Sequence, residues 1–185
     1  MSSIPSPTTD LVEVTTTYVQ LNSPDQLRAA TLADPDLLVL EAHQSSVAFY
    51  RFLYDAVGRD FTWTDRLHWS DERLAAHLRR PEVTVLVLYV RGNPAGYIEL
   101  DAAPEEAGET GTEIAYFGLL PAFHGRGLGK YFLSLGVARA FADGASRVWL
   151  HTCTLDGPHA LANYQARGFV PYKTTTELEP VGGAV

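Results

Sequence analysis

The sequence has little of several features that would define a function class. One cysteine, Cys153, excludes an internal disulfide and fits a reducing compartment. Lysine and arginine number 14 against 22 aspartates and glutamates, and the net charge of −8 argues against nucleic acid as a partner. No apolar run is long enough to span a bilayer, so we expect no membrane partner. The 6 histidines lack metal-ligand spacing, and we expect no metal.

The remaining composition is that of an ordinary globular protein. The chain of 185 residues predicts one domain, residues 11–180, with flexible tails at 1–10 and 181–185. The first residues lack the basic and apolar regions of a signal peptide, so we expect a cytoplasmic location. The acidic balance would suit a cationic substrate such as an amine, although acidity also serves solubility alone.

The most informative stretch that is present is a glycine-rich turn between a predicted strand, residues 114–120, and a predicted helix. The turn lies in the run 123–130, where three glycines at alternate positions let the backbone approach an anion closely. Unpaired N–H groups and the dipole of a helix N-terminus favour a phosphate there. Arg126 and Lys130 add positive charge. A tight turn without a ligand is the alternative interpretation.

Two familiar phosphate motifs do not fit this turn. The Rossmann fingerprint is G-x-G-x-x-G in the first βα turn of a domain, whereas this turn has the spacing G-x-G-x-G and lies deep in the chain. The Walker loop requires a glycine at the position of His124 and a serine or threonine at that of Tyr131. Both motifs are therefore excluded.

The turn resembles motif A of the GCN5-related N-acetyltransferases, [Gln/Arg]-x-x-Gly-x-[Gly/Ala]. Here it reads His124-Gly125-Arg126-Gly127-Leu128-Gly129, with histidine where the family usually has glutamine or arginine. The stretch 160–169 resembles the family's motif B, whose usual form is A-hydrophobic-x-x-Tyr-x-x-x-Gly-Phe, although the asparagine that often opens it is replaced by Gly157. The similarity covers about residues 83–177.

The resemblance implies an α/β fold with a mixed, mostly antiparallel central sheet that is flanked by helices and splayed between its fourth and fifth strands. Residue patterns predict strands over 15–21, 83–90, 96–100, 114–120 and 147–153. They predict helices over 24–31, over 45–57 and from Ser70 to before Pro81, besides those of the two motifs. The acidic stretch 101–111 is predicted to be a mobile surface loop.

By the same resemblance, the chain binds acetyl-CoA as a co-substrate, with the pyrophosphate on the glycine turn and the pantetheine along the preceding strand. The implied contact residues are Phe117, Gly118, Leu119, Leu120, His124, Gly125, Arg126, Gly127, Leu128, Gly129, Lys130 and Asn163. The N–H of Leu119 or Leu120 would polarise the thioester carbonyl.

Acetyl transfer to an amine requires a base, because an alkylammonium with a pKa of about 10.4 is protonated at neutral pH. Glu113 is the first candidate, since a glutamate at the matching place is the base in histone-type members. Glu99 is the alternative, and a water relay is also open; either glutamate could instead be a surface carboxylate. Tyr164 matches the motif B tyrosine that donates to the CoA sulfur in many members, unless it is only packed.

We therefore expect an acetyl-CoA-dependent N-acetyltransferase in which a primary amine attacks directly within a ternary complex. The amine is a small molecule or a peptide or protein amine, and a homodimer is left open. A non-catalytic acyl-CoA-binding sensor is the alternative, which would need neither base nor acid. Among the N-terminal aromatic residues, mostly expected in the core, Tyr50 and Trp63 are candidates for contact with the amine.

Overall fold

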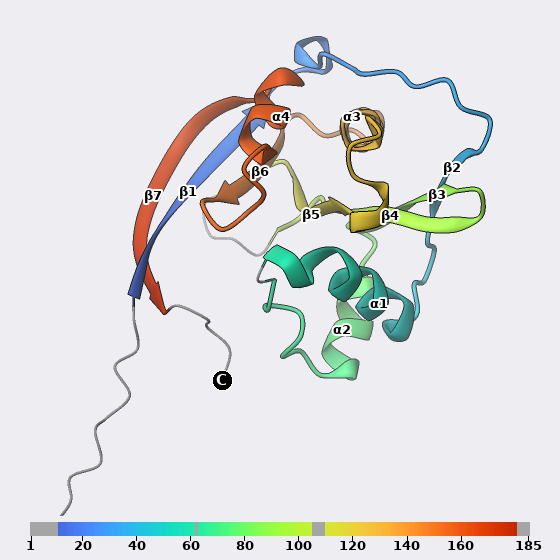
Figure 1. Cartoon of the computed structure of the whole chain (residues 1–185), viewed down its shortest axis with the longest axis horizontal. Helices are drawn as coiled ribbons and strands as arrows, with labels where there is room; N and C mark the ends of the chain where they lie inside the picture. The colour runs from blue at the N-terminus through green and yellow to red at the C-terminus, as the bar shows by residue number, and fades with distance from the viewer. Residues whose placement is uncertain (1–10, 62, 105–109, 181–185) are drawn as a thin grey trace, which may run out of the picture.

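The computed structural model of the protein describes residues 11–61, 63–104 and 110–180. These residues form a seven-stranded sheet in the order β2-β3-β4-β5-β6-β1-β7, with helices on both faces (Figure 1). Adjacent strands are antiparallel except β5 and β6, which run parallel. The mixed, mostly antiparallel sheet predicted from the sequence is thereby confirmed. The expected tails and the centre of the predicted loop lie outside the described residues.

The described residues form seven strands and four α-helices. The strands are β1 (Leu11–Leu21), β2 (Leu37–Glu41), β3 (Val83–Val90), β4 (Asn93–Asp101), β5 (Thr112–Leu119), β6 (Val148–Cys153) and β7 (Val170–Pro180). The helices are α1 (Val47–Gly58), α2 (Asp71–Leu78), α3 (Leu128–Ala142) and α4 (Ala160–Ala166). Short 3₁₀ turns lie at Pro24–Gln26, Arg59–Phe61 and Pro121–Phe123.

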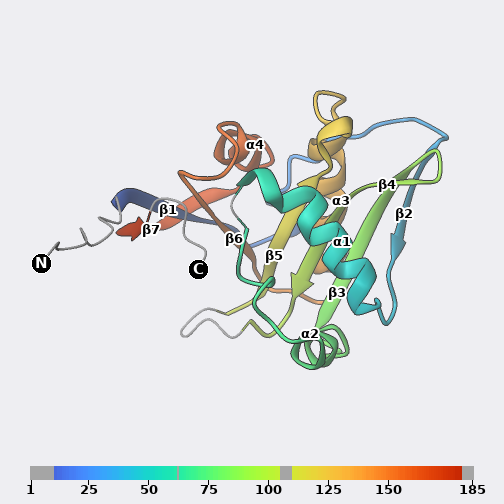
Figure 2. The ribbon, with the colours of Figure 1, turned by 60° about the horizontal axis from the view of Figure 1, so that its bottom comes forward.

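The first two helices begin at serine caps, close to the predicted positions. The hydroxyl of Ser46 accepts a hydrogen bond from the N–H of Phe49, and that of Ser70 accepts one from the N–H of Arg73. Both helices cover the same face of β3, β4 and β5 (Figure 2). No helix within the described ranges is both long and apolar enough to cross a bilayer.

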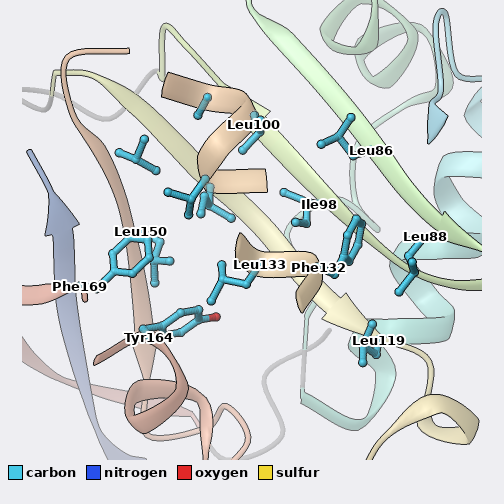
Figure 3. Close-up of a cluster of buried hydrophobic side chains, with 14 of the residues drawn as sticks. Leu86, Leu88, Ile98, Leu100, Leu119, Phe132, Leu133, Leu150, Tyr164 and Phe169 are labelled. Atoms are coloured by element: carbon cyan, nitrogen blue, oxygen red, sulfur yellow. The ribbon is translucent and has the colours of Figure 1, made fainter. Parts of the chain in front are cut away.

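Two apolar cores lie on opposite faces of the sheet, because side chains of a strand alternate between its faces. On β3, Val85 and Val87 face α1 and α2, whereas Leu86 and Leu88 face α3 (Figure 3). Gly136 of α3 packs closely against β4, since a Cβ atom there would lie 2.5 Å from a methyl group of the buried Ile98.

Part of the predicted secondary structure is wrong for tertiary reasons. The predicted helix 24–31 is limited to the 3₁₀ turn, because the following backbone bonds to other elements: the N–H of Arg28 to the Arg167 carbonyl and that of Ala30 to the Ser134 hydroxyl. The strand predicted over 96–100 begins earlier, at Asn93, because Arg91 and Gly92 form a two-residue turn with φ values of 51° and 78°.

The first strand is inserted between the last two. β1 pairs with β6 from Thr16 to Leu21 and with β7 along most of its length. β6 therefore has β1 as its long partner, while its pairing with β5 is restricted to Thr112 with Val148 and Glu113 with Trp149. The predicted splay between the strands 114–120 and 147–153 corresponds to this break in pairing between β5 and β6.

Candidate active site

The edge of β5 that faces away from β4 has no strand partner beyond Glu113 within the described residues. We call this the open edge of β5. The N–H of Leu120 donates to the Ala95 carbonyl, so it faces β4. Because strand backbone groups alternate in direction, those of Leu119 and Phe117 face the open edge, whereas those of Gly118 face β4. Leu119 and Phe117 can therefore pair with an extended ligand.

His124 fixes the end of this edge. Its Nε2 atom lies 2.9 Å from the Leu119 carbonyl oxygen, which requires the proton on Nε2. The imidazole thus joins the turn to the strand, a role the sequence left open for this position.

The glycine turn that follows presents uncapped N–H groups. Gly125 and Gly127 have φ values of 72° and 74°, in the left-handed region that favours glycine. Gly127 is the N-cap of α3, and no side chain caps the first N–H groups of the helix. Buried Leu128 anchors the helix start, and exposed Arg126 and Lys130 flank it. These residues fit a phosphate-bearing ligand, since the amide donors, the helix dipole and the positive charge coincide.

Tyr164 of α4 lies across from the open edge. Its ring centroid is 6.3 Å from that of Phe117, and its hydroxyl points toward β5 (Figure 3). Burial, followed by the charge of Asp156, raises the pKa of the Tyr164 hydroxyl well above its usual value, so the phenol stays protonated. Asn163, one residue earlier, is half-buried.

A bulge in β5 decides where Glu113 points. Leu100 pairs with Ile114 and Glu99 with Tyr116, so Ala115 has no partner on β4. The bulge places Glu113 with Ala115 on the face that α1 and α2 cover, while Phe117 packs on the other face. Simple alternation would have put Glu113 on the side of Phe117.

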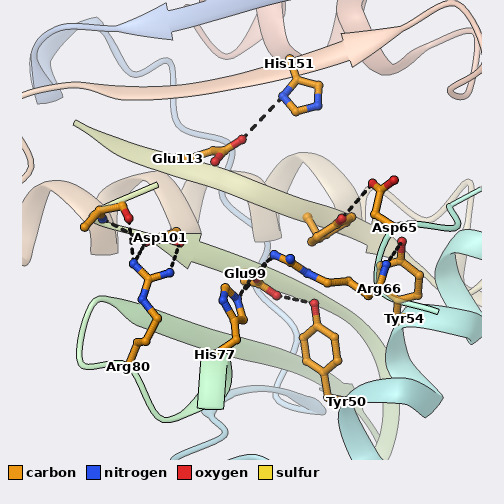
Figure 4. A network of polar contacts seen from close by, with 12 residues as sticks. Tyr50, Tyr54, Asp65, Arg66, His77, Arg80, Glu99, Asp101, Glu113 and His151 are labelled. Carbon is orange, nitrogen blue, oxygen red and sulfur yellow. Dashed lines mark hydrogen bonds and ion pairs between the residues drawn. The ribbon is translucent and has the colours of Figure 1, made fainter. Parts of the chain in front are cut away.

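Glu113 and Ala115 line a pocket of about 150 Å³ together with Arg66, Trp69, His77, Arg80 and Asp101. The Glu113 side chain is 12% exposed, and its carboxylate lies 3.5 Å from Nδ1 of His151 on β6 (Figure 4). Glu113 therefore offers a pocket-facing carboxylate at the point where β5 and β6 separate.

Glu99 is a different kind of carboxylate. It is 0% exposed, so the interpretation of it as a surface residue was wrong. The Tyr50 hydroxyl donates to one carboxylate oxygen, and His77 Nε2 and Arg66 Nη2 lie 2.8 and 3.1 Å from the other (Figure 4). Burial raises the pKa of Glu99, but His77, Arg66 and Tyr50 outweigh it, and the pKa is lowered.

Sequence reasoning missed Arg66 and His77 as members of this site. Nothing in the sequence marks them, because they meet Glu99 only through the packing of distant segments.

Two aromatic residues were candidates for contact with the amine. Tyr50 is fully buried against Glu99, which excludes that contact, and Trp63 packs against Tyr54 and Tyr116. The described residues contain no group of three or more His, Cys, Asp or Glu side chains suited to a metal ion.

The splayed parallel strands β5 and β6, with a glycine turn between the end of β5 and α3, define a mixed α/β fold that has a candidate anion-binding turn beside the opening in its sheet. The family model described as "Acetyltransferase (GNAT) family" matches residues 50–169. The chain belongs to this family.

Solved structures share the fold at low sequence identity. A GCN5-related N-acetyltransferase from Kribbella flavida is 19% identical, with 94% of this chain and 60% of that chain covered and a TM-score of 0.64. One from Sphaerobacter thermophilus is 16% identical, with 91% and 51% covered and a TM-score of 0.60. The aminoglycoside acetyltransferase meta-AAC0020, from an uncultured soil metagenomic sample, is 15% identical, with 72% and 88% covered and a TM-score of 0.59.

The chain thus spans 60% and 51% of the length of the Kribbella and Sphaerobacter proteins. Among curated proteins, none matches the chain.

Proposed function

We propose that the protein transfers an acetyl group from acetyl-CoA to a primary amine by direct attack within a ternary complex. The observation that carries the proposal is the arrangement along β5, which leads from the pocket at Glu113, past the open edge at Phe117, to the glycine turn after Leu119. A single strand thus connects a carboxylate, a backbone edge and an anion-binding turn.

The acetyl-CoA co-substrate would supply the acetyl group as an activated thioester. Amides 125–129 with Arg126 and Lys130 would hold its phosphates, and the outward backbone groups of Phe117 would pair with its amide groups. The Leu119 N–H is the better candidate for polarising the thioester, because the Leu120 N–H is engaged by Ala95. Asn163 would reach the same ligand from α4.

Glu113 would take the proton from the incoming ammonium group, directly or through water. Its carboxylate faces the pocket and has His151 as its ion-pair partner among the described side chains. Glu99 is a poor base, because three donors occupy its oxygens and its pKa is lowered. Tyr164, protonated and directed at the open edge, would donate to the departing sulfur.

The test follows thiol release from acetyl-CoA with a broad panel of amines. We expect Glu113→Gln to lower kcat by about 10²- to 10⁴-fold, the usual contribution of a general base. The control is Glu82→Gln, which removes a half-exposed carboxylate that lies outside the Glu113 pocket. Unchanged turnover in Glu113→Gln would remove Glu113 as the base, and unchanged turnover in Tyr164→Phe would remove the acid.

The alternative function, a non-catalytic acyl-CoA sensor, makes a different prediction. It requires tight acetyl-CoA binding in calorimetry and no thiol release with any amine of the panel. Absence of binding would contradict both functions together.

We place this enzyme in the cytoplasm, which agrees with the single cysteine and with a co-substrate of intracellular metabolism.

A further inference from the structure

One part of the pocket that Glu113 lines is formed by a segment held in place by several hydrogen bonds. This segment, 63–70, precedes α2 and carries Arg66. The Arg66 N–H donates to the Tyr54 hydroxyl at 3.3 Å. The guanidinium of Arg51 donates to the carbonyls of Arg66 and Trp69 at 3.3 and 2.7 Å. The backbone position of Arg66 is thus fixed from α1.

The guanidinium of Arg66 is also fixed. It lies 3.9 Å from the ring centre of Trp69 and 5.2 Å from that of Tyr116, so it is flanked by aromatic rings. Its Nη2 atom donates to buried Glu99 at 3.1 Å. His77 must carry a proton on Nε2 to bond to Glu99, so the 3.5 Å approach of Nη2 to that nitrogen is no hydrogen bond.

Arg66 keeps donors that these contacts do not use. Its bond to Glu99 engages Nη2 alone, and Nε is buried and out of reach of a ligand, which leaves Nη1 and the second N–H of Nη2 without a bond to the described residues. Arg80, the other arginine of the pocket, differs: its two Nη atoms bond to both carboxylate oxygens of Asp101, and Nη2 also bonds to the Ala103 carbonyl. Arg66 is therefore the pocket arginine with donors left for a ligand.

Stability alone does not explain this arrangement. A buried ion pair such as Arg66 with Glu99 is often no more stabilising than apolar side chains of similar volume, because both charges lose their hydration. A guanidinium held by a buried carboxylate and two rings has a fixed orientation, which suits planar, two-point recognition of a carboxylate.

We infer that Arg66 binds a carboxylate of the acceptor, so that the substrate class is an amino acid or another small amine that carries a carboxylate. The pocket has Glu113 for the ammonium group and Arg66 for the carboxylate, which matches the two charges of a zwitterion. The pocket volume of about 150 Å³ agrees with a small acceptor. The inference rests on the proposed function and names the acceptor of the same site.

The experiment compares free amino acids with their carboxamides, which keep the amine and lose the negative charge. For the wild type we expect kcat/KM to be about 10- to 100-fold higher for the acid than for its amide, the range for a hydrogen bond to a charged group. Arg66→Lys keeps the positive charge but loses the two-point geometry of the guanidinium. It should therefore raise KM for the acid and leave KM for the amide unchanged. The ratio of kcat/KM for the acid to that for the amide should then approach one.

Arg73→Lys is the matched control. Arg73 lies 3.8 Å from the opposite side of Trp69 and does not line the pocket, so its substitution should leave the ratio unchanged. Equal use of acids and amides by the wild type would overturn the inference without any variant. So would a preference for an amine that carries no carboxylate, or an equal loss with both substrates in Arg66→Lys.

Calorimetric titration of the CoA-bound protein separates this inference from the proposed function. Amino acids should bind at least about tenfold more tightly than their amides, and Arg66→Lys should remove the difference. If no amine is acetylated but this binding is seen, the transferase function fails and the Arg66 site stands. If amines are acetylated but amides bind as well as acids, the function stands and the inference fails.

Discussion

At the residue scale, two glutamates on neighbouring strands have different surroundings. Glu99 is enclosed by three donors and has a lowered pKa, whereas Glu113 lies at a pocket beside a histidine. The enclosed carboxylate bonds to Arg66 and His77, and the pocket-facing one is the residue that we propose as the base. The sequence alone ranked both as candidate bases because it shows neither set of neighbours.

Replacement of Glu99 by glutamine should destabilise the protein. It removes the charge that compensates buried Arg66, and breaking a buried pair in this way costs about 3–5 kcal/mol of unfolding free energy. Chemical denaturation at pH 7 measures the effect. Glu82→Gln is a control, because its ion pair with Arg80 is 3.7 Å long and half-exposed and should matter by less than about 1 kcal/mol.

The pH dependence of the same variant tests the lowered pKa. A carboxyl group whose folded pKa lies below its ordinary value of 4.5 stabilises the fold fully above that pH. The contribution is lost as the pH falls below 4.5 toward the folded pKa. The difference in unfolding free energy between wild type and Glu99→Gln should therefore shrink on acidification. A difference that stays constant or grows below pH 4.5 would contradict this account.

At the scale of elements, what could be predicted depended on local signals. The turn 123–130 could be predicted from the sequence because its glycines, the preceding strand and the following helix are contiguous in the chain. β2 was missed because Leu38 and Leu40 are exposed on an edge strand while Leu37 and Val39 pack inward, so the run shows no polar alternation. The β5 bulge at Ala115 depends on register with β4, which no local pattern fixes.

The start of α3 provides a prediction with an internal control. Gly127 and Gly144 lie just outside the two ends of the helix with φ values of 74° and 100°, which strain an alanine, although a Cβ atom at either position would meet no atom closer than 3.4 Å. Alanine at either position should therefore lower the unfolding free energy by about 1–2 kcal/mol. We expect only Gly127→Ala to weaken acetyl-CoA binding in calorimetry, by about tenfold, because it shifts the amides of the turn.

If both alanine variants bound acetyl-CoA as tightly as the wild type, the placement of the phosphates at α3 would be contradicted. Equal loss of binding in both variants would show that general destabilisation, rather than the turn, limits affinity. The unfolding free energies of the two variants keep these outcomes apart.

At the scale of the whole molecule, the position of β1 accounts for the open edge of β5. β1 occupies one side of β6 from Thr16 to Leu21, so β6 is held in the sheet without further pairing to β5. The family match begins at residue 50, yet β1 and β7 complete this half of the sheet from outside the matched segment. β1 and β7 thus help to form the half of the sheet that borders the candidate site, although the motifs of that site lie between these two strands in the sequence.

The most direct test of the account is hydrogen–deuterium exchange of the backbone with and without saturating acetyl-CoA. The amides of Phe117 and Leu119 and those of residues 125–129 should exchange quickly in the free protein and slowly in the complex. The paired amides of β3 should not change. Protection that is absent from residues 117–129, or that lies elsewhere on the molecule, would contradict the assignment of the open edge of β5 and the turn as the acetyl-CoA site.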